Sequence, residues 1–365
     1  MIRVLQILPR VPPAVCGVAE YAWNLADALR REQQIETMFL AAGTGYVDPK
    51  PNTEHEVRRL DTLSTAALTG FVQEQADGLS GVILHLSPYG FASRGAPVWL
   101  ARAVRQISQM DKRLSLVTMF HETYASGPWN SSAFWLQPVQ KWVVRQIAKS
   151  SNVVRTHREG YAVSLQAAVA DQGKRIVIMP VFSNFGEPTT PTPIASRSPQ
   201  MIMFSTGIQA GTQANNMRDT GIQQCRKYGL TKLHLLGGHW PQSEICESVE
   251  IVRHSFLPRV EIEALLSDCR MGFMAYPPEY LGKSTFFAAM AAHGLAVVTQ
   301  GSQSELPDGL REGREILHER SVRPSAERLQ SVASGIHQWY SRHNLACNAG
   351  SYAEDIRRGM NECAF

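Results

Sequence analysis

Residues 270–299 read RMGFMAYPPEYLGKSTFFAAMAAHGLAVVT, and this stretch decides the fold class. Two short apolar runs, 270–276 and 295–299, have the length and composition of buried β-strands. Between them, residues 284–293 are small and apolar and begin with Ser and Thr, which favour a helix start. A strand, a helix and a second strand in this order indicate the βαβ unit of a parallel sheet.

The same alternation extends along the whole chain. The other predicted strands are 4–8, 36–40, 81–86, 114–120, 152–155, 175–179, 200–205, 232–236 and 249–253. The other predicted helices include 19–30, 96–110, 138–149 and 259–268. Apolar strands that alternate with amphipathic helices predict an α/β protein, with parallel sheets covered on both faces. We therefore expect two Rossmann-like, doubly wound domains that face each other across a cleft.

Length and composition limit the classes of function. A chain of 365 residues usually forms two domains, and 44% hydrophobic with 19% charged residues is typical of a soluble globular protein. The net charge of +4 comes without a Lys/Arg-rich run, so nucleic acid is not an expected partner. The six cysteines are scattered without metal-ligand spacing, which favours reduced thiols in the cytoplasm and no metal site.

The Pro-, Ser- and Thr-rich stretch around residues 184–199 lacks helical or strand periodicity. It predicts a linker between an N-terminal domain, residues 1–183, and a C-terminal domain, residues 200–345. No apolar run has the length of a membrane span.

The candidate phosphate-binding residues stand at the start of the helix 284–293. They are Glu279, Gly282, Lys283, Ser284 and Thr285. Free N–H groups and the helix dipole attract anions at such a start, and lysine adds a positive charge. A Walker A loop is excluded, because it needs a glycine five positions before Gly282, where Pro277 stands. The structural alternative is an ordinary helix start capped by Ser284.

Two segments of the first half also follow predicted strands. Gly17 opens the first helix and leaves backbone N–H groups accessible, although glycine could serve the turn alone. His121 and Glu122 follow the strand 114–120 directly, with Tyr124 two residues on. His121 could position a sugar and Glu122 could bind a hydroxyl, whereas the structural alternative is a histidine satisfied within the loop.

A basic stripe runs along the helix 138–149. Lys141, Arg145 and Lys149 recur every four positions, with Trp142 beside them. Such a stripe could touch anionic lipid at the inner membrane, but more often it is a solvated helix face.

Three segments together resemble bacterial glycosyltransferases of the GT-B fold, family 4 type. They are LPRVPPAVCGVAEYAWNLADALR (8–30), VTMFHETYASGPWNSSAFWLQPVQ (117–140) and LLSDCRMGFMAYPPEYLGKSTFFAAMAAHGLAVV (265–298). The resemblance implies transfer of a sugar from a nucleotide-diphosphate donor, with retention and without a cofactor or metal ion. The acceptor would be a glycan or a lipid-linked sugar of cell-surface polysaccharide synthesis.

The resemblance also implies roles for residues. Gly17 and residues 279–285 match donor-binding loops, and His121 matches a histidine that contacts the donor sugar. Glu122 joins His121 as a catalytic candidate, while Glu20 and Tyr124 fall on the acceptor side. Residues 346–365 match a last helix that packs back on the N-terminal domain.

The sequence departs from the family pattern at two places. Where the family carries two glutamates with seven residues between them, this chain has Tyr280 and Ala288. Residues 207–217 contain none of the usual cations that neutralise the diphosphate. These departures leave open a catalytically silent GT-B domain that binds a glycan or partner protein. A sugar-nucleotide epimerase of the same fold is a second alternative.

Overall fold

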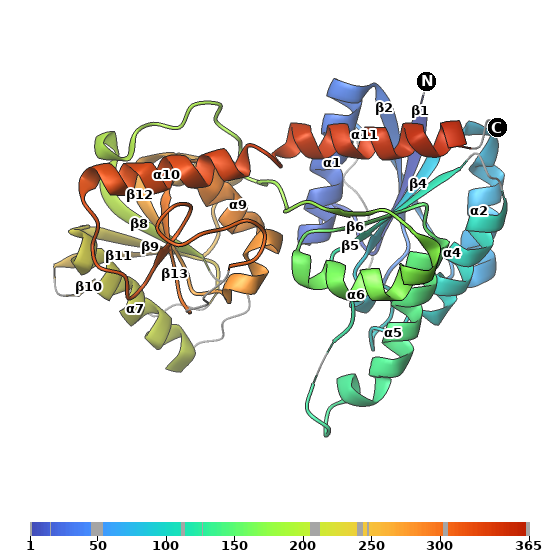
Figure 1. The fold of residues 1–365 in the computed structure, drawn as a ribbon, viewed down its shortest axis with the longest axis horizontal. Coiled ribbons are helices and arrows are strands. Elements are labelled where there is room, and N and C mark those ends of the chain that lie inside the picture. Colours follow the sequence, from blue (N-terminus) through green and yellow to red (C-terminus); the bar gives the residue numbers. More distant parts are fainter. Residues whose placement is uncertain are drawn as a thin grey trace. The chain divides into compact units, whose positions relative to one another are not determined.

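The computed structural model describes residues 2–14, 16–44, 54–110, 114–125, 127–204, 212–238, 244–246, 248–301 and 306–362. The chain divides into two compact units. Unit 1 comprises Met1–Pro180 and Leu345–Phe365, and unit 2 comprises Val181–Asn344. Figure 1 shows both units and labels most of their elements.

Unit 1 is built on a parallel sheet. Its strands are β1 (Ile2–Leu8), β2 (Ile35–Ala41), β3 (Glu56–Arg59), β4 (Gly81–Leu86), β5 (Ser115–Phe120), β6 (Val153–Thr156) and β7 (Ile176–Ile178). They lie in the order β3-β2-β1-β4-β5-β6-β7. The strand order reverses between β1 and β4, which is the switch point where doubly wound sheets bind ligands.

The helices of unit 1 cover both faces of this sheet. They are α1 (Gly17–Gln33), α2 (Thr65–Gln75), α3 (Pro88–Phe91), α4 (Val98–Met110), α5 (Ser132–Ser150), α6 (Glu159–Val169) and α11 (Leu345–Glu362). The apolar sides of α2, α4 and α5 pack on one face in the largest core cluster of the unit. On the other face α11 lies along α1, next to β4 and β5 (Figure 1).

Unit 2 repeats this plan with one antiparallel edge strand. Its strands are β8 (Ser198–Phe204), β9 (Lys232–Leu236), β10 (Glu244–Cys246), β11 (Val249–His254), β12 (Cys269–Met274), β13 (Ala296–Thr299) and β14 (Leu317–His318). Its helices are α7 (Thr212–Tyr228), α8 (Arg259–Asp268), α9 (Thr285–Ala292) and α10 (Ala326–Tyr340). The strand order is β10-β11-β9-β8-β12-β13-β14, so the switch point lies between β8 and β12.

The predicted α/β class and the doubly wound plan of both domains are confirmed. Residues 184–199, which the sequence predicts as a linker, belong to unit 2. Ile194 is buried in the core of that unit. The buried Arg197 guanidinium donates hydrogen bonds to the carbonyls of Leu266, Cys269 and His293. These bonds satisfy backbone carbonyls inside unit 2 and tie Arg197 to them.

Candidate functional site

A pocket of about 350 Å³ opens at the carboxyl ends of β12 and β13 in unit 2. Its lining residues are Ala275, Tyr276, Pro277, Pro278, Glu279, Gln300 and Gly301. Because β12 borders the switch point, the pocket lies where a sheet of this kind binds ligands. Glu279 is the one predicted donor-binding residue among its lining residues.

Aromatic rings and a cation adjoin this pocket. The ring centroids of Tyr276 and Tyr280 lie 5.9 Å apart in an edge-on arrangement. The Lys283 ammonium lies 5.3 Å from the centroid of the Tyr280 ring, a distance that permits a cation–π interaction. Tyr276 therefore connects the pocket, through Tyr280, to a positively charged side chain.

The helix start beyond Lys283 has the structure of an ordinary capped helix. A 3₁₀ turn, Pro278–Lys283, leads into α9, and the Ser284 hydroxyl accepts a hydrogen bond of 3.2 Å from the Phe287 N–H. The carbonyl of the buried Gly282 accepts from the Val181 N–H at 2.9 Å. Ser284 and Gly282 thus have structural roles, while Thr285, the first residue of α9, is only partly buried.

Position 288, where the resembled family carries a glutamate, lies in the buried part of α9. Phe286 through Ala292 are all buried, and Ala288 is only 2% exposed. A carboxylate at position 288 would lose its hydration, which is costly unless a partner compensates for it. In this chain the position is filled by core packing. Residues 207–211 of the predicted cation-free loop lie outside the described residues.

In unit 1, Gly17 is exposed at the N-terminus of α1. The N-cap residue Cys16 makes no side-chain capping bond. A Cβ built on Gly17 would meet no atom within 4 Å, and Gly17 is not among the described glycines with positive φ. The fold therefore gives no steric or backbone reason for glycine here. Glu20 stands exposed in the first turn of the same helix.

Glu122 and Tyr124 lie beyond the carboxyl end of β5. The Ser87 hydroxyl, which follows β4, donates to the Glu122 carboxylate at 3.1 Å. The Lys141 ammonium lies 5.1 Å from the centroid of the Tyr124 ring. Both predicted residues are partly exposed, so their side chains are accessible to a ligand.

His121 belongs to a chain of hydrogen bonds that runs from Gln6 on β1 to Met179, directly after β7. Its Nε2 lies 3.1 Å from His85 Nδ1, and its Nδ1 lies 3.0 Å from His157 Nε2. At one end of the chain His85 Nε2 lies 2.7 Å from the Gln6 side-chain oxygen. At the other end His157 Nδ1 lies 3.4 Å from the Met179 carbonyl. All three imidazoles are buried.

The number of protons in this histidine chain is informative. Each of its four contacts needs one proton, whereas three neutral imidazoles carry only three. Gln6 adds none, because its oxygen faces His85 and its amide nitrogen donates to the Thr37 hydroxyl at 3.4 Å. With all three imidazoles neutral, one of these four contacts therefore has no proton between its two atoms. Burial lowers the pKa of His85 to about 3, so His85 is neutral at neutral pH.

Tyr21 of α1 covers the three imidazoles. Its ring stands edge-on to His85, His121 and His157, with centroids 5.1–5.9 Å apart. Its hydroxyl lies 3.4 Å from the Tyr352 hydroxyl of α11. The two contacts of His121 with His85 and His157 occupy both of its ring nitrogens. Contact with a donor sugar, as the sequence predicts, would require one of these bonds to break.

The sequence analysis did not predict the other members of the histidine chain. Gln6 and His85 lie inside strands that looked like ordinary core, and Tyr21 lies inside a predicted helix. A usable signal does exist. A histidine stands at or next to the carboxyl end of three consecutive strands of the chain, in HLS (85–87), FHE (120–122) and THR (156–158).

Among the described residues, no three His, Cys, Asp or Glu side chains converge on a point that suits a metal ion. The described cysteines are free thiols.

Comparison with solved structures gives matches over nearly the whole chain. A glycosyltransferase from Rickettsia africae has a TM-score of 0.56 at 10% identity, over 98% of both chains. A UDP-forming α,α-trehalose-phosphate synthase from Burkholderia xenovorans, in complex with glucose-6-phosphate, has a TM-score of 0.59 at 9% identity, over 98% of this chain and 100% of that one. A lipopolysaccharide outer core galactosyltransferase has a TM-score of 0.56 at 11% identity, over 98% of this chain and 99% of that one.

Comparisons with protein-family models and with curated protein sequences give no match. The structural likeness confirms the fold class: this is a two-domain α/β protein with the Rossmann-like GT-B fold. At 9–11% identity the likeness extends to the fold and not to a particular activity.

Proposed function

We propose that this chain is a retaining, hexosyltransferase-type glycosyltransferase of the GT-B family 4 type. It moves a sugar from a nucleotide-diphosphate donor to a glycan or lipid-linked acceptor in cell-surface polysaccharide synthesis in the cytoplasm. The observation that carries the proposal is the pocket beside the switch point of unit 2, next to Lys283 and lined by Glu279. The likeness to a UDP-forming synthase supports a nucleotide-sugar donor.

In the proposed reaction, the bond between the anomeric carbon and the donor phosphate oxygen breaks as the acceptor oxygen bonds to that carbon. The proton of the acceptor hydroxyl passes to the leaving phosphate. Negative charge then develops on the leaving diphosphate. Lys283 and the positive end of α9, at Thr285, supply the charge that stabilises it. Glu279 and Tyr276 would hold the nucleoside or sugar in the pocket. The residues alone supply these groups, without a metal ion or cofactor.

Unit 1 supplies the remaining predicted groups. Gly17 would let the donor phosphates approach an uncapped helix start. Glu122, oriented by Ser87, is the candidate for binding an acceptor hydroxyl, with Glu20 and Tyr124 on the acceptor side. His121 would orient this region through its histidine partners, and it could contact the sugar only by exchanging one of them.

The decisive experiment is calorimetry with UDP, GDP, ADP and their sugars. We expect saturable binding of one nucleotide series, and at least a tenfold loss of affinity in Lys283→Ala, which removes about 1.4 kcal/mol or more of binding free energy. Lys232→Ala is the matched control, because Lys232 begins β9 and so lies at the amino end of the same sheet.

The main alternative is a silent GT-B domain that binds a glycan or a partner protein. The absence of Arg and Lys from residues 207–217 favours it. If the folded wild-type protein binds no nucleotide, the hypothesis of a silent domain replaces that of an enzyme. Conversion of a UDP-sugar without any acceptor would instead indicate an epimerase.

A further inference from the structure

The start of α5 and the loop before it expose large aromatic side chains. Trp129 is 74% exposed, Trp135 69%, Phe134 47% and Trp142 42%. Side chains of this size are usually buried, and isolated exceptions need no explanation. Here four aromatic side chains fall within residues 129–142, together with the exposed Val139.

These side chains share the outward side of α5. The exposed residues of the helix are Phe134, Trp135, Pro138, Val139, Lys141, Trp142 and Arg145. Their spacing of three, four and seven places them on one side of a helix. The opposite side carries Val143, Val144 and Ile147, which are buried in the core of unit 1. The outward aromatic side is therefore held in place by a well-packed inward side.

The charge around the aromatic residues has one sign. Lys141 and Arg145 are exposed on the same side, and no Asp or Glu occurs from residue 123 to residue 158. Within the part of the chain that the structure describes, neither of these two cations forms an ion pair with a carboxylate. No carboxylate of the described residues neutralises their charge, and the contact of Lys141 with the Tyr124 ring leaves that charge in place.

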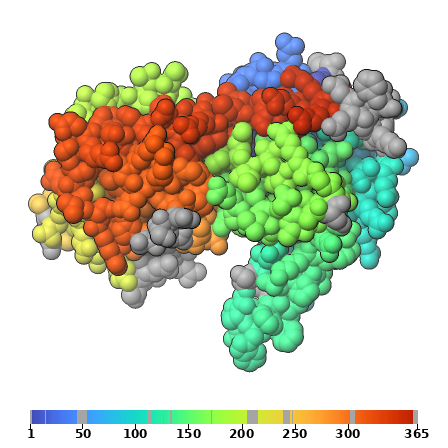
Figure 2. Space-filling view, in the orientation of Figure 1, coloured from blue at the N-terminus to red at the C-terminus, as the bar shows by residue number. Residues whose placement is uncertain are grey.

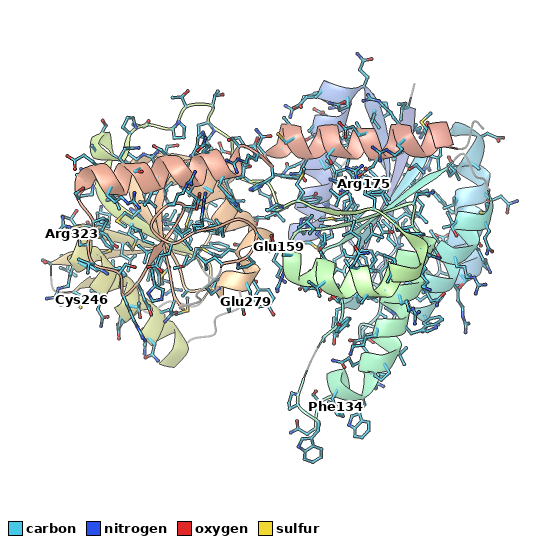
Figure 3. The ribbon with its side chains drawn as sticks, in the orientation of Figure 1. Phe134, Glu159, Arg175, Cys246, Glu279 and Arg323 are labelled. Carbon is cyan, nitrogen blue, oxygen red and sulfur yellow. The ribbon has the colours of Figure 1, made fainter. Side chains whose placement is uncertain are left out.

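This part of α5 stands away from the rest of unit 1. Figure 1 shows the first turns of the helix and the preceding loop extending beyond the sheet and its other helices. In Figure 3 Phe134 lies near the end of this projection, and the space-filling view shows the same projection as a narrow arm.

We propose that this α5 surface, made of Trp129, Phe134, Trp135, Val139, Lys141, Trp142 and Arg145, docks on an anionic lipid bilayer. Tryptophan combines an apolar ring with an N–H donor and favours the interface between hydrocarbon and water. Basic side chains next to it add attraction to anionic headgroups. A narrow projection suits a deformable layer, into which it can insert, better than a rigid protein surface.

Docking of this kind is peripheral. No helix of the described residues combines the length and the apolar character that crossing a bilayer requires. The inference goes beyond the proposed function, since it concerns a surface of unit 1 and needs no transfer activity. For a glycosyltransferase it favours the lipid-linked acceptor over the soluble glycan.

The test is flotation of the full-length protein with two kinds of vesicle. One contains phosphatidylcholine alone, and the other contains equal parts of phosphatidylcholine and phosphatidylglycerol. We expect binding to the anionic vesicles that weakens as salt rises. Trp129→Ser with Trp135→Ser, and separately Lys141→Gln with Arg145→Gln, should each lower the partition coefficient at least about tenfold.

Two matched controls separate the α5 surface from general effects. Arg102→Gln with Arg105→Gln removes two exposed charges from α4 of the same unit. Phe256→Ser removes an isolated aromatic side chain of unit 2 that is 83% exposed. Both should bind vesicles as the wild type does.

Three results would overturn the proposal. Wild-type protein could fail to float with anionic vesicles, or the α5 variants could bind as well as the controls. The third result is a wild-type protein that is a dimer in solution and does not bind vesicles, together with tryptophan substitutions that make it a monomer. The α5 surface would then bind a second copy of the chain. Calorimetry without vesicles tests the nucleotide site separately. The membrane-docking hypothesis and the nucleotide-binding hypothesis can therefore each fail independently of the other.

Discussion

Gly17 occupies a position where the fold does not require glycine. We predict that Gly17→Ala leaves the melting temperature unchanged or slightly higher, because a Cβ there meets no atom within 4 Å and alanine favours helix. If donor phosphates approach this backbone, the added methyl group should reduce nucleotide affinity at least about tenfold, or about 1.4 kcal/mol.

Gly70 provides the matched control for this substitution. It lies within α2, and a Cβ there also meets nothing within 4 Å. Gly70→Ala should raise stability, because alanine favours a helix interior, and should leave nucleotide affinity unchanged. Equal affinities in wild type and Gly17→Ala would show that glycine serves only the loop before α1.

His85 should make unit 1 sensitive to acid. Burial lowers the pKa of His85 to about 3, below the usual value of 6.5. The unfolded chain therefore binds a proton at this residue between pH 6.5 and pH 3, while the folded chain does not. The resulting stability is fully present above pH 6.5 and is lost as the pH falls, with a slope of at most about 1.4 kcal/mol per pH unit.

Urea unfolding at a series of pH values, followed by hydrogen exchange in unit 1, measures this dependence. His85→Gln should lower stability at neutral pH and flatten the slope between pH 6.5 and pH 3. An unchanged slope in the variant would show that His85 takes up its proton in the folded state as easily as in the unfolded state.

Among the elements, α9 allows capping to be separated from ligand binding. Ser284 caps α9, and aspartate caps helices about as well as serine. We predict that Ser284→Asp keeps the stability of unit 2 but weakens nucleotide binding, because its carboxylate repels a diphosphate. Ser284→Ala should do the reverse: it costs about 1 kcal/mol of stability and changes the affinity less.

Thermal unfolding and calorimetry on the two variants provide the measurements. If Ser284→Asp binds nucleotide like the wild type, the diphosphate does not lie at the start of α9. The pocket beside β12 would then hold some other kind of ligand.

The strands were easier to predict than the helix ends. The strand β9 has the predicted bounds, and β4 does too, because a buried parallel strand is an apolar run with clear limits. The edge strand β3 was missed because EVRR is polar and mostly exposed. The helix α5 begins at Ser132, six positions before the predicted start, since Pro138 is accommodated on its exposed side.

The candidate site also has parts that the sequence could predict and parts that it could not. The sequence could place Glu122 and Glu279 in loops that follow strands, and parallel strands end at one edge of their sheet. The histidine chain could not be located from sequence, because it depends on register across strands that are far apart in the sequence. On β4 and β5, for example, His85 pairs with Met119, which brings His121 within reach.

At the scale of the whole molecule, unit 1 depends on α11. The buried carboxylate of Asp355 binds Arg155 and Arg175, and Arg155 also lies over the Tyr352 ring. We predict that Asp355→Asn destabilises unit 1 by about 3–5 kcal/mol, because it leaves the buried Arg155 charge without its counter-ion. Unit 2 has a separate core and should keep its stability.

Hydrogen exchange resolved by peptide distinguishes the two units in one experiment. Protection should fall in the peptides of β5 and β6 and stay constant in those of β12 and β13. Glu354→Gln is the control, because this neighbour on α11 is exposed. An equal loss of protection in both units would show that they unfold as one cooperative body.

The discontinuity of unit 1 also sets an order during biosynthesis. Unit 2 is one continuous segment, Val181–Asn344, so the ribosome completes it before it makes α11. The β4 and β5 strands of unit 1 must wait for α11 to cover them. The half of the protein that is translated first is therefore the last to complete its fold, and its uncovered sheet needs protection from aggregation until then.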